Sequence, residues 1–206
     1  MALIKLNNRG VRNVSEFGSV GVGSMVFIKK LTASSSATLS FVDGASSVVL
    51  DDTYKEYMFT FNNIHPETNA AKFSFQGNAA GGSGYDETIT SAFFYAYHDE
   101  ADSEQGLSYY GSGDQAQGTA FQRFSSGGVG NGNDECTSGF LRLFNPSSTT
   151  FVKHFISRNS TYQDNNSVND NYVSGYFNTT SAIDEIQFKF DSGDIDAGDI
   201  CLYGIK

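Results

Sequence analysis

The amino-acid sequence predicts an all-β protein: a single-domain antiparallel β-sandwich, jelly-roll-like, with an extended N-terminal arm. Short segments in which apolar and polar side chains alternate recur along the chain, and this period of two is typical of half-buried strands. Clusters of Gly, Asn, Asp and Ser separate these segments, and no stretch shows the apolar i, i+3, i+4, i+7 spacing of a helix. The 206 residues suffice for one large domain. Many short strands without intervening helices favour a sandwich, with a closed barrel as the alternative.

The predicted domain covers residues 25–206, and its first half contains five alternating segments. Each is predicted as a strand because large apolar side chains occupy every second position. These side chains are Val26 and Ile28, Leu39 and Phe41, Tyr57, Phe59 and Phe61, then Phe73 and Phe75. The fifth segment, residues 88–97, begins with polar threonines and ends in aromatic residues.

The second half of the domain also contains five predicted strands. Residues 140–144 and 151–156 flank the turn 145–148, Asn-Pro-Ser-Ser, and this arrangement predicts an antiparallel hairpin. Residues 172–178 follow. In residues 186–190, Ile, Phe and Phe alternate with Gln and Lys, and residues 200–205 close the chain.

Residues 98–135 do not fit a compact series of strands. They are rich in Gly, Ser and acidic residues and contain two strand-like islands, 107–110 and 119–124. Because a structureless loop of this length would be unusual, we predict an edge hairpin with loops at one end of the sandwich. Binding residues tend to lie on such loops.

Composition and charge exclude several classes of protein. Asp and Glu total 23 against 13 Lys and Arg, a net charge of -10, which argues against nucleic-acid binding. The longest apolar runs are far shorter than the ~20 residues of a membrane-spanning helix, and we expect no membrane association and no secretory signal. Cys136 and Cys201 have no metal-ligand spacing and are expected to be free thiols.

The predicted arm, residues 1–24, differs in charge from the rest of the chain. It carries Lys5, Arg9 and Arg12 against Glu16, a net charge of +2, which leaves -12 for residues 25–206. One interpretation is a chain end packed on the surface of its own domain. The other is a basic arm that anchors the protein on a neighbouring subunit.

Four aspartates before the last predicted strand are the candidates for a metal site. Asp191, Asp194, Asp196 and Asp199 fall within nine residues, and calcium takes oxygen ligands from flexible loops of this kind. The segment lacks the twelve-residue calcium loop with its terminal Glu, and Asx-turns between two strands explain the same residues. We therefore expect no resident metal and no other cofactor.

The sequence contains no recognisable catalytic motif, and we expect no enzymatic activity. Nucleophile-elbow, phosphate-loop and dinucleotide-binding patterns are absent. The three histidines are scattered, and only His98 lies among several carboxylates, those of Asp99, Glu100, Asp102 and Glu104. Crowded carboxylates can serve acid-base chemistry, but charges on a loop are more often simply solvated.

Several longer phrases resemble a known protein family. They are NIHPET at 63–68, AYHDEAD at 96–102, LFNPSSTT at 143–150, GYFNTTSAID at 175–184 and LYGI at 202–205. From about residue 25 to the C-terminus the chain is similar to virion structural proteins that are abundant in marine tailed phages, including phages of cyanobacteria. Other members tend to have Asn or Ser at the positions of Asp194 and Asp199, which weakens the calcium hypothesis.

The resemblance implies a non-enzymatic component of the virion. The leading expectation is a capsid decoration (cement) or head-appendage protein, a homotrimer whose basic arm contacts the major capsid protein or neighbouring copies. The alternative is a tail-fibre or receptor-binding module that holds host glycans through Tyr85, Tyr109 and Tyr110. A glycan-cleaving enzyme would need a carboxylate pair in a groove, and the sequence favours no such pair.

Overall fold

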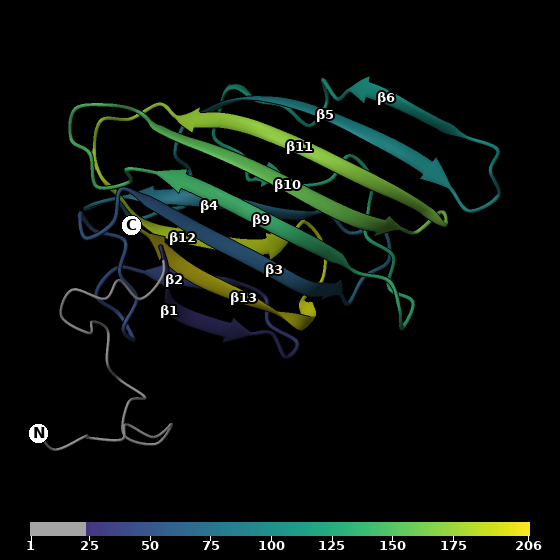
Figure 1. Cartoon of the computed structure of the whole chain (residues 1–206), viewed down its shortest axis with the longest axis horizontal. Coiled ribbons are helices and arrows are strands. Elements are labelled where there is room, and N and C mark those ends of the chain that lie inside the picture. The colour runs from purple at the N-terminus through teal and green to yellow at the C-terminus, as the bar shows by residue number, and fades with distance from the viewer. Residues whose placement is uncertain (1–23) are drawn as a thin grey trace, which may run out of the picture.

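The computed structural model describes residues 24–206, which form two antiparallel sheets that face each other (Figure 1). This part of the chain contains thirteen strands and no α-helix. The strands are β1 (Met25–Thr32), β2 (Leu39–Val42), β3 (Glu56–Pro66), β4 (Phe73–Ala79), β5 (Ile89–Asp99), β6 (Gln105–Tyr109), β7 (Ala116–Gly118), β8 (Gln122–Arg123), β9 (Thr137–Phe144), β10 (Lys153–Gln163), β11 (Ser167–Phe177), β12 (Ile183–Phe190) and β13 (Ile195–Ile205). The predicted all-β sandwich is confirmed. Except for Ser24, the predicted arm lies outside the described residues.

Eight of the strands have the connectivity of a jelly roll. The larger sheet begins β1-β13-β3-β9, and the smaller sheet is β2-β12-β4-β8. Along the chain, β1 to β4 therefore pair in reverse order with the strands of the second half, β1 with β13, β2 with β12, β3 with β9 and β4 with β8. This is the arrangement of a long antiparallel ribbon folded over into two sheets.

The other five strands come from two insertions into this jelly roll. One insertion, β5–β7, lies between β4 and β8, and the other, β10–β11, lies between β9 and β12. They continue the larger sheet beyond β9 in the order β10-β11-β5-β6, and β7 also pairs with β5. We call these five strands the extension. Figure 1 shows them as the continuation of the sheet on the side opposite β1.

The two hairpins predicted from sequence have different outcomes. The hairpin around residues 145–148 is confirmed, because β9 and β10 pair from Leu143–Phe155 to Thr137–Thr161. The edge hairpin predicted within residues 98–135 forms only in part, because the first island joins β5 at the edge of the larger sheet and the second island takes no part in it. β6 pairs with β5 in the larger sheet, whereas β8 pairs with β4 in the smaller one, since the intervening chain crosses between the sheets.

Phenylalanine side chains fill the space between the two sheets of the jelly roll. The alternation of the strands points Phe41, Phe59, Phe61, Phe73, Phe75, Phe124 and Phe188 inward, and all are fully buried or nearly so. Their rings pack in edge-to-face and stacked arrangements, with centroids of Phe61 and Phe188 5.3 Å apart and those of Phe75 and Phe124 4.9 Å apart. Most of the aromatic content thus belongs to the core, as the alternation predicts.

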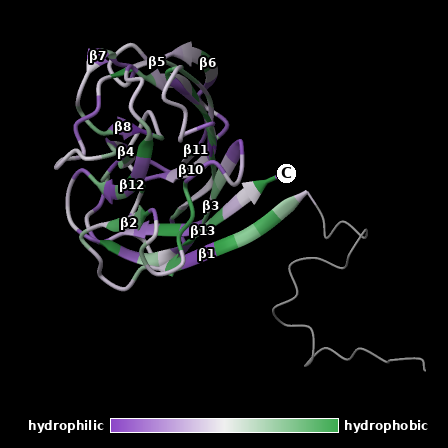
Figure 2. Cartoon of the chain, turned by 90° about the vertical axis from the view of Figure 1, so that its left-hand side faces the viewer, coloured by the Kyte–Doolittle hydropathy of each residue, from purple (hydrophilic) through white to green (hydrophobic). Residues whose placement is uncertain are grey.

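The inner face of the extension is polar only in part. Its buried apolar side chains are Ile89, Phe93, Phe155, Val173 and Phe177, and the rings of Phe155 and Phe177 pack against Phe75 of the smaller sheet. Its buried polar side chains are Ser157, Asn159, Thr161 and Gln163 on β10 and Ser167, Asn169 and Asn171 on β11. Figure 2 shows mostly hydrophobic ribbon along β1 and more hydrophilic ribbon at β7.

Candidate functional site

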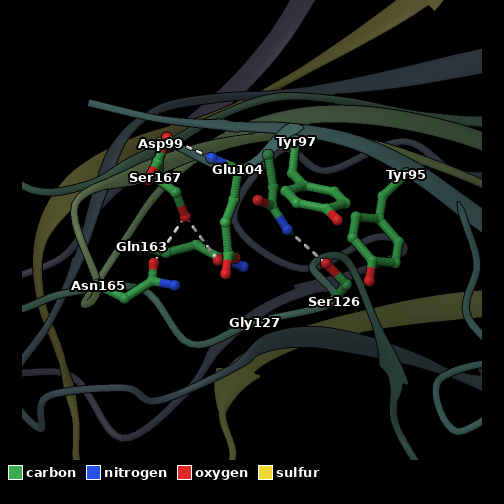
Figure 3. A pocket seen from close by; sticks show the side chains of 10 residues that line it. Tyr95, Tyr97, Asp99, Glu104, Ser126, Gly127, Gln163, Asn165 and Ser167 are labelled. Carbon is green, nitrogen blue, oxygen red and sulfur yellow. Dashed lines mark hydrogen bonds between the residues drawn. The ribbon is translucent and has the colours of Figure 1, made fainter. Parts of the chain in front are cut away.

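A cleft of about 310 Å³ opens on the inner face of the extension. Figure 3 shows its side chains, which come from β5, β10, β11 and three loops. The lining residues are Tyr95, Tyr97, Asp99, Glu104, Ser126, Gly127, Gln163, Asn165, Ser167 and Asn169. Carboxylates, amides, hydroxyls and two phenol rings thus meet in one concave place. We call it the cleft.

Strand β5 forms the aromatic wall of the cleft. Its alternation turns Tyr95, Tyr97 and Asp99 to the inner face and the residues between them to the outer face. The rings of Tyr95 and Tyr97 lie side by side, with centroids 5.7 Å apart. Behind them, the ring of Tyr110 packs edge-on against Tyr95 at 5.8 Å and against Phe93 at 5.2 Å, which holds the wall in place.

Amide side chains of β11 lie beside the two tyrosines, because Asn169 and Asn171 are the cross-strand partners of Tyr97 and Tyr95, and they hold a loop over the sheet. The Asn169 Nδ2 group donates to Ser126 Oγ, and the Ser126 amide N–H donates to Asn171 Oδ1 at 3.0 Å. Asn171 Nδ2 in turn donates to the carbonyl oxygen of Asn169 at 3.1 Å. Because Asn171 is fully buried, these bonds fix the position of the loop that closes the cleft.

The two carboxylates of the cleft have different roles. Asp99 accepts hydrogen bonds from the Ser103 hydroxyl and from the backbone N–H groups of Ser103 and Glu104, the latter two at 2.8 and 3.0 Å. These bonds, the Ser103 hydroxyl first among them, lower the pKa of Asp99 to about 2. Asp99 is therefore ionised and shapes the turn, while the Glu104 side chain reaches into the cleft (Figure 3).

The turn at residues 99–104 is expected to respond to acid. Since the folded-state pKa of Asp99 is depressed from 3.8 to about 2, its stabilisation of the turn is present above pH 3.8 and is lost as the pH falls through about 2. In NMR spectra, the Ser103 and Glu104 amide resonances should titrate with a midpoint near pH 2. Asp99→Asn should abolish this titration, and a wild-type midpoint at or above 3.8 would contradict the prediction.

The outer face of the larger sheet is a second surface of interest. Within residues 24–206, no strand or loop layer covers it. Its exposed apolar side chains, spread from β1 to β6, are Met25, Phe27, Phe94, Leu107, Tyr109, Ile156 and Val168. The ring of Phe94 stacks on that of Tyr172 with centroids 4.8 Å apart, which leaves a flat aromatic surface. Phe94, Tyr109 and Leu107 are neighbours on β5 and β6, and a contiguous exposed apolar patch of this kind is typical of an interaction surface.

Most charges on the strands of the outer face are paired. Three ion pairs lie there: Arg158–Asp170 at 2.8 Å, Arg142–Glu56 at 2.7 Å and Lys30–Asp199 at 3.1 Å. A fourth acidic side chain, that of Asp196 on β13, lies 3.5 Å from His65 Nδ1. The whole chain has a net charge of -10, so these strands carry only a small part of the chain's excess negative charge.

The three tyrosines predicted as glycan contacts do not form one site. Tyr85 donates its hydroxyl hydrogen to Glu185 Oε2 at 2.7 Å, and burial together with this bond raises its pKa. Tyr109 lies on the outer face, with its hydroxyl bonded to Asp114. Tyr110 points the opposite way and supports Tyr95 from behind. Strand alternation separates the last two, so the three tyrosines lie apart from one another.

The four aspartates considered as candidates for a calcium site are also apart, each with its own partners. Asp191 accepts the Lys72 amide at 2.8 Å, Asp196 lies 3.5 Å from His65 Nδ1, and Asp199 bonds Thr32 and Lys30. The remaining residue, Asp194, donates its backbone N–H to Glu67. Within residues 24–206, no three or more His, Cys, Asp or Glu side chains are grouped so that they could hold a metal ion.

The remaining groups predicted from the sequence lie in different parts of the chain. The anchoring residues Lys5, Arg9 and Arg12 lie outside the described residues. The acidic cluster at His98 is divided by the strand, because His98 faces outward and pairs with Asp102 at 3.2 Å, whereas Asp99 lines the cleft. Cys136 and Cys201 are free thiols, and Cys201 is buried.

Sequence reasoning missed the cleft residues Tyr95, Tyr97, Gln163 and Asn169. The sequence did contain an indication of a polar inner face. Amides and hydroxyls occupy alternate positions of residues 157–171, whereas a strand buried on one face usually carries apolar side chains at such positions. Such a run indicates a buried polar face. The partner face and the loop that close it come from distant parts of the chain.

Comparisons with family models, with curated proteins and with solved structures found no match. In the part of the chain that the structure describes, there is no helix with the length and apolar character needed to cross a membrane.

Proposed function

We propose that the chain is a non-enzymatic structural protein of a virion, and that its copies associate through the outer face of the larger sheet. The observation that carries the proposal is the outer face itself, which exposes apolar side chains and has most of its charges in ion pairs, on a strongly acidic chain. Copies that each carry a charge of -10 repel one another. Association is least opposed where the facing surfaces have no net charge and bury apolar area.

The fold and the sequence support this proposal in different ways. Jelly rolls are frequent in viral capsid proteins, although they also occur in lectins, so the fold alone does not assign a function. The sequence phrases that resemble virion structural proteins of marine tailed phages support a location in the virion. A homotrimer of decoration or head-appendage type is the assembly we propose, with the major capsid protein or neighbouring copies as partners.

Charges placed on the outer face are expected to separate the copies. In the full chain, Phe94→Glu combined with Ile156→Glu puts carboxylates at two positions that are 43% and 47% exposed, so folding should be retained. Sedimentation should show the wild type as a trimer and the double variant as a monomer. Phe151→Glu is the matched control, because Phe151 is 70% exposed but lies in a turn away from this face. A monomeric wild type, or an unchanged double variant, would contradict the proposal.

Removal of the arm tests where the protein is attached. Deleting residues 1–23 should abolish its incorporation into phage particles, because Lys5, Arg9 and Arg12 are lost, while the β domain stays folded. The cut leaves Ser24, whose carbonyl accepts the Lys206 N–H at 2.8 Å. Immunoblotting of purified particles and circular dichroism of the isolated variant measure the two effects. Retained incorporation would overturn the anchoring role, and absence of the full-length chain from particles would overturn the virion assignment.

A further inference from the structure

We propose that the cleft on the inner face of the extension is a binding site for a neutral carbohydrate, the end of a glycan with one or two pyranose rings. This proposal is independent of the self-association of the outer face, because the two surfaces lie on opposite sides of the larger sheet. The cleft volume of about 310 Å³ lies near the lower limit of small-molecule sites, which suits a ligand of this size.

The hydrogen-bonding groups of the cleft call for a ligand rich in donors. A carboxylate accepts hydrogen bonds, and the Glu104 side chain reaches into the cleft, whereas the oxygens of Asp99 already accept hydrogen bonds within the turn at Ser103 and Glu104. Amide and hydroxyl groups of Gln163, Asn165 and Ser167 also line the cleft. Hydroxyl groups of a sugar can both donate to the carboxylate and exchange hydrogen bonds with these amides and hydroxyls.

The aromatic wall suits the less polar part of a sugar's surface. A pyranose ring has hydroxyls at its rim and a less polar face of C–H groups. The adjacent rings of Tyr95 and Tyr97 offer an apolar body with polar hydroxyl ends, a surface suited to such an amphipathic ligand. The cleft therefore presents a stacking wall together with hydrogen-bond acceptors.

Other ligand classes fit less well. None of the described residues that line the cleft is Lys, Arg or His, so an anionic sugar or a phosphate would face two carboxylates without a counter-charge. A purely apolar ligand would bury these carboxylates and amides without hydrogen bonds, which is unfavourable. A cation is a third class. It would need the carboxylate oxygens of Asp99 as ligands, and these oxygens already accept hydrogen bonds from Ser103 and Glu104.

The cleft is also held in its shape before any ligand arrives. Asn171 and Asn169 fix the Ser126 loop, Tyr110 supports Tyr95, and the bonds of Asp99 set the turn that carries Glu104. A site of this kind loses little conformational freedom on binding. We therefore expect binding without a large rearrangement.

The experiment screens the full-length protein on an array of neutral, amino-bearing, sialylated and sulfated glycans, followed by calorimetry with the best neutral oligosaccharide. Tyr97→Ala should weaken its binding about tenfold or more by removing one stacking ring. Glu104→Gln, a second variant with little effect on packing, should weaken it as well. Tyr109→Ala, a tyrosine of the outer face, is the matched control and should bind like the wild type.

Each result decides the proposal. Binding of a neutral glycan that falls in both cleft variants and persists in Tyr109→Ala supports it. Binding of charged glycans only, a response to calcium chloride alone, no binding on the array, or neutral-glycan binding that both variants leave unchanged would each overturn it. Sedimentation of the same samples reports self-association separately, so that failure of the glycan site and failure of the proposed assembly are distinguishable.

Discussion

Replacing Phe188 with alanine is expected to lower the free energy of unfolding by about 3–5 kcal/mol, the usual cost of deleting a large buried aromatic side chain. Phe188, on β12, is fully buried at the centre of the aromatic core. Its ring centroid lies 5.3 Å from those of Phe59 and Phe61, both from the opposite sheet. The cavity would thus remove contacts that hold the two sheets together.

Denaturant unfolding measured by circular dichroism checks this value. Phe151→Ala is the control, since this side chain is 70% exposed and its loss should change stability by no more than about 0.5 kcal/mol. A loss below about 1 kcal/mol for Phe188→Ala would mean that the core repacks around the cavity, contrary to the prediction.

Replacing Gly139 with valine is expected to cost about 3 kcal/mol, the upper part of the range for overpacked sites. Gly139 lies on β9, where the extension joins the jelly roll, and pairs with Asn159 of β10. A Cβ atom there would lie 2.3 Å from the Arg158 carbonyl oxygen and 2.7 Å from the Asn159 Cα atom. Both are backbone atoms, so relief requires the two strands to separate.

Hydrogen exchange can locate this effect as well as measure it. Amides of β10 and β11 should lose protection in Gly139→Val before those of β2 and β12, because the clash lies at the junction of the extension. Gly111→Val is the control, since a Cβ at Gly111 meets only a Tyr109 ring atom at 3.9 Å. Equal loss of protection in both sheets would show that the extension and the jelly roll unfold as one unit.

The extension is the part of the fold that produces both candidate surfaces. Its strands widen one sheet of the jelly roll far beyond the other. The outer face thereby becomes broad and uncovered, and part of the inner face becomes a polar surface that the Ser126 loop can close into the cleft. Two insertions into a common fold thus account for a proposed assembly surface and a proposed ligand site.

Charge could be assessed from the sequence only as sums over segments of the chain. The net charges of +2 for residues 1–24 and -12 for residues 25–206 were evident, but the pairing of charges on the outer face, such as Arg158 with Asp170 and Lys30 with Asp199, was not. The second pair joins residues 169 positions apart. Only the pairing of β1 with β13 brings them together.

The sequence by itself determined the class of the fold and the position of most strands, because a period of two is a local property of the chain. Phe59, Phe61 and Phe188 could be assigned to strand faces for this reason, and the hairpin at 145–148 followed from its turn. The tertiary structure alone decided which strands are neighbours and which side chains share a surface. Tyr109 and Tyr110 are adjacent in sequence but face opposite sides of the sheet, whereas Tyr97 and Asn169 are far apart and line the same cleft. The physical reason is that strand pairing is non-local, so a site built across strands exists only after the sheet has formed.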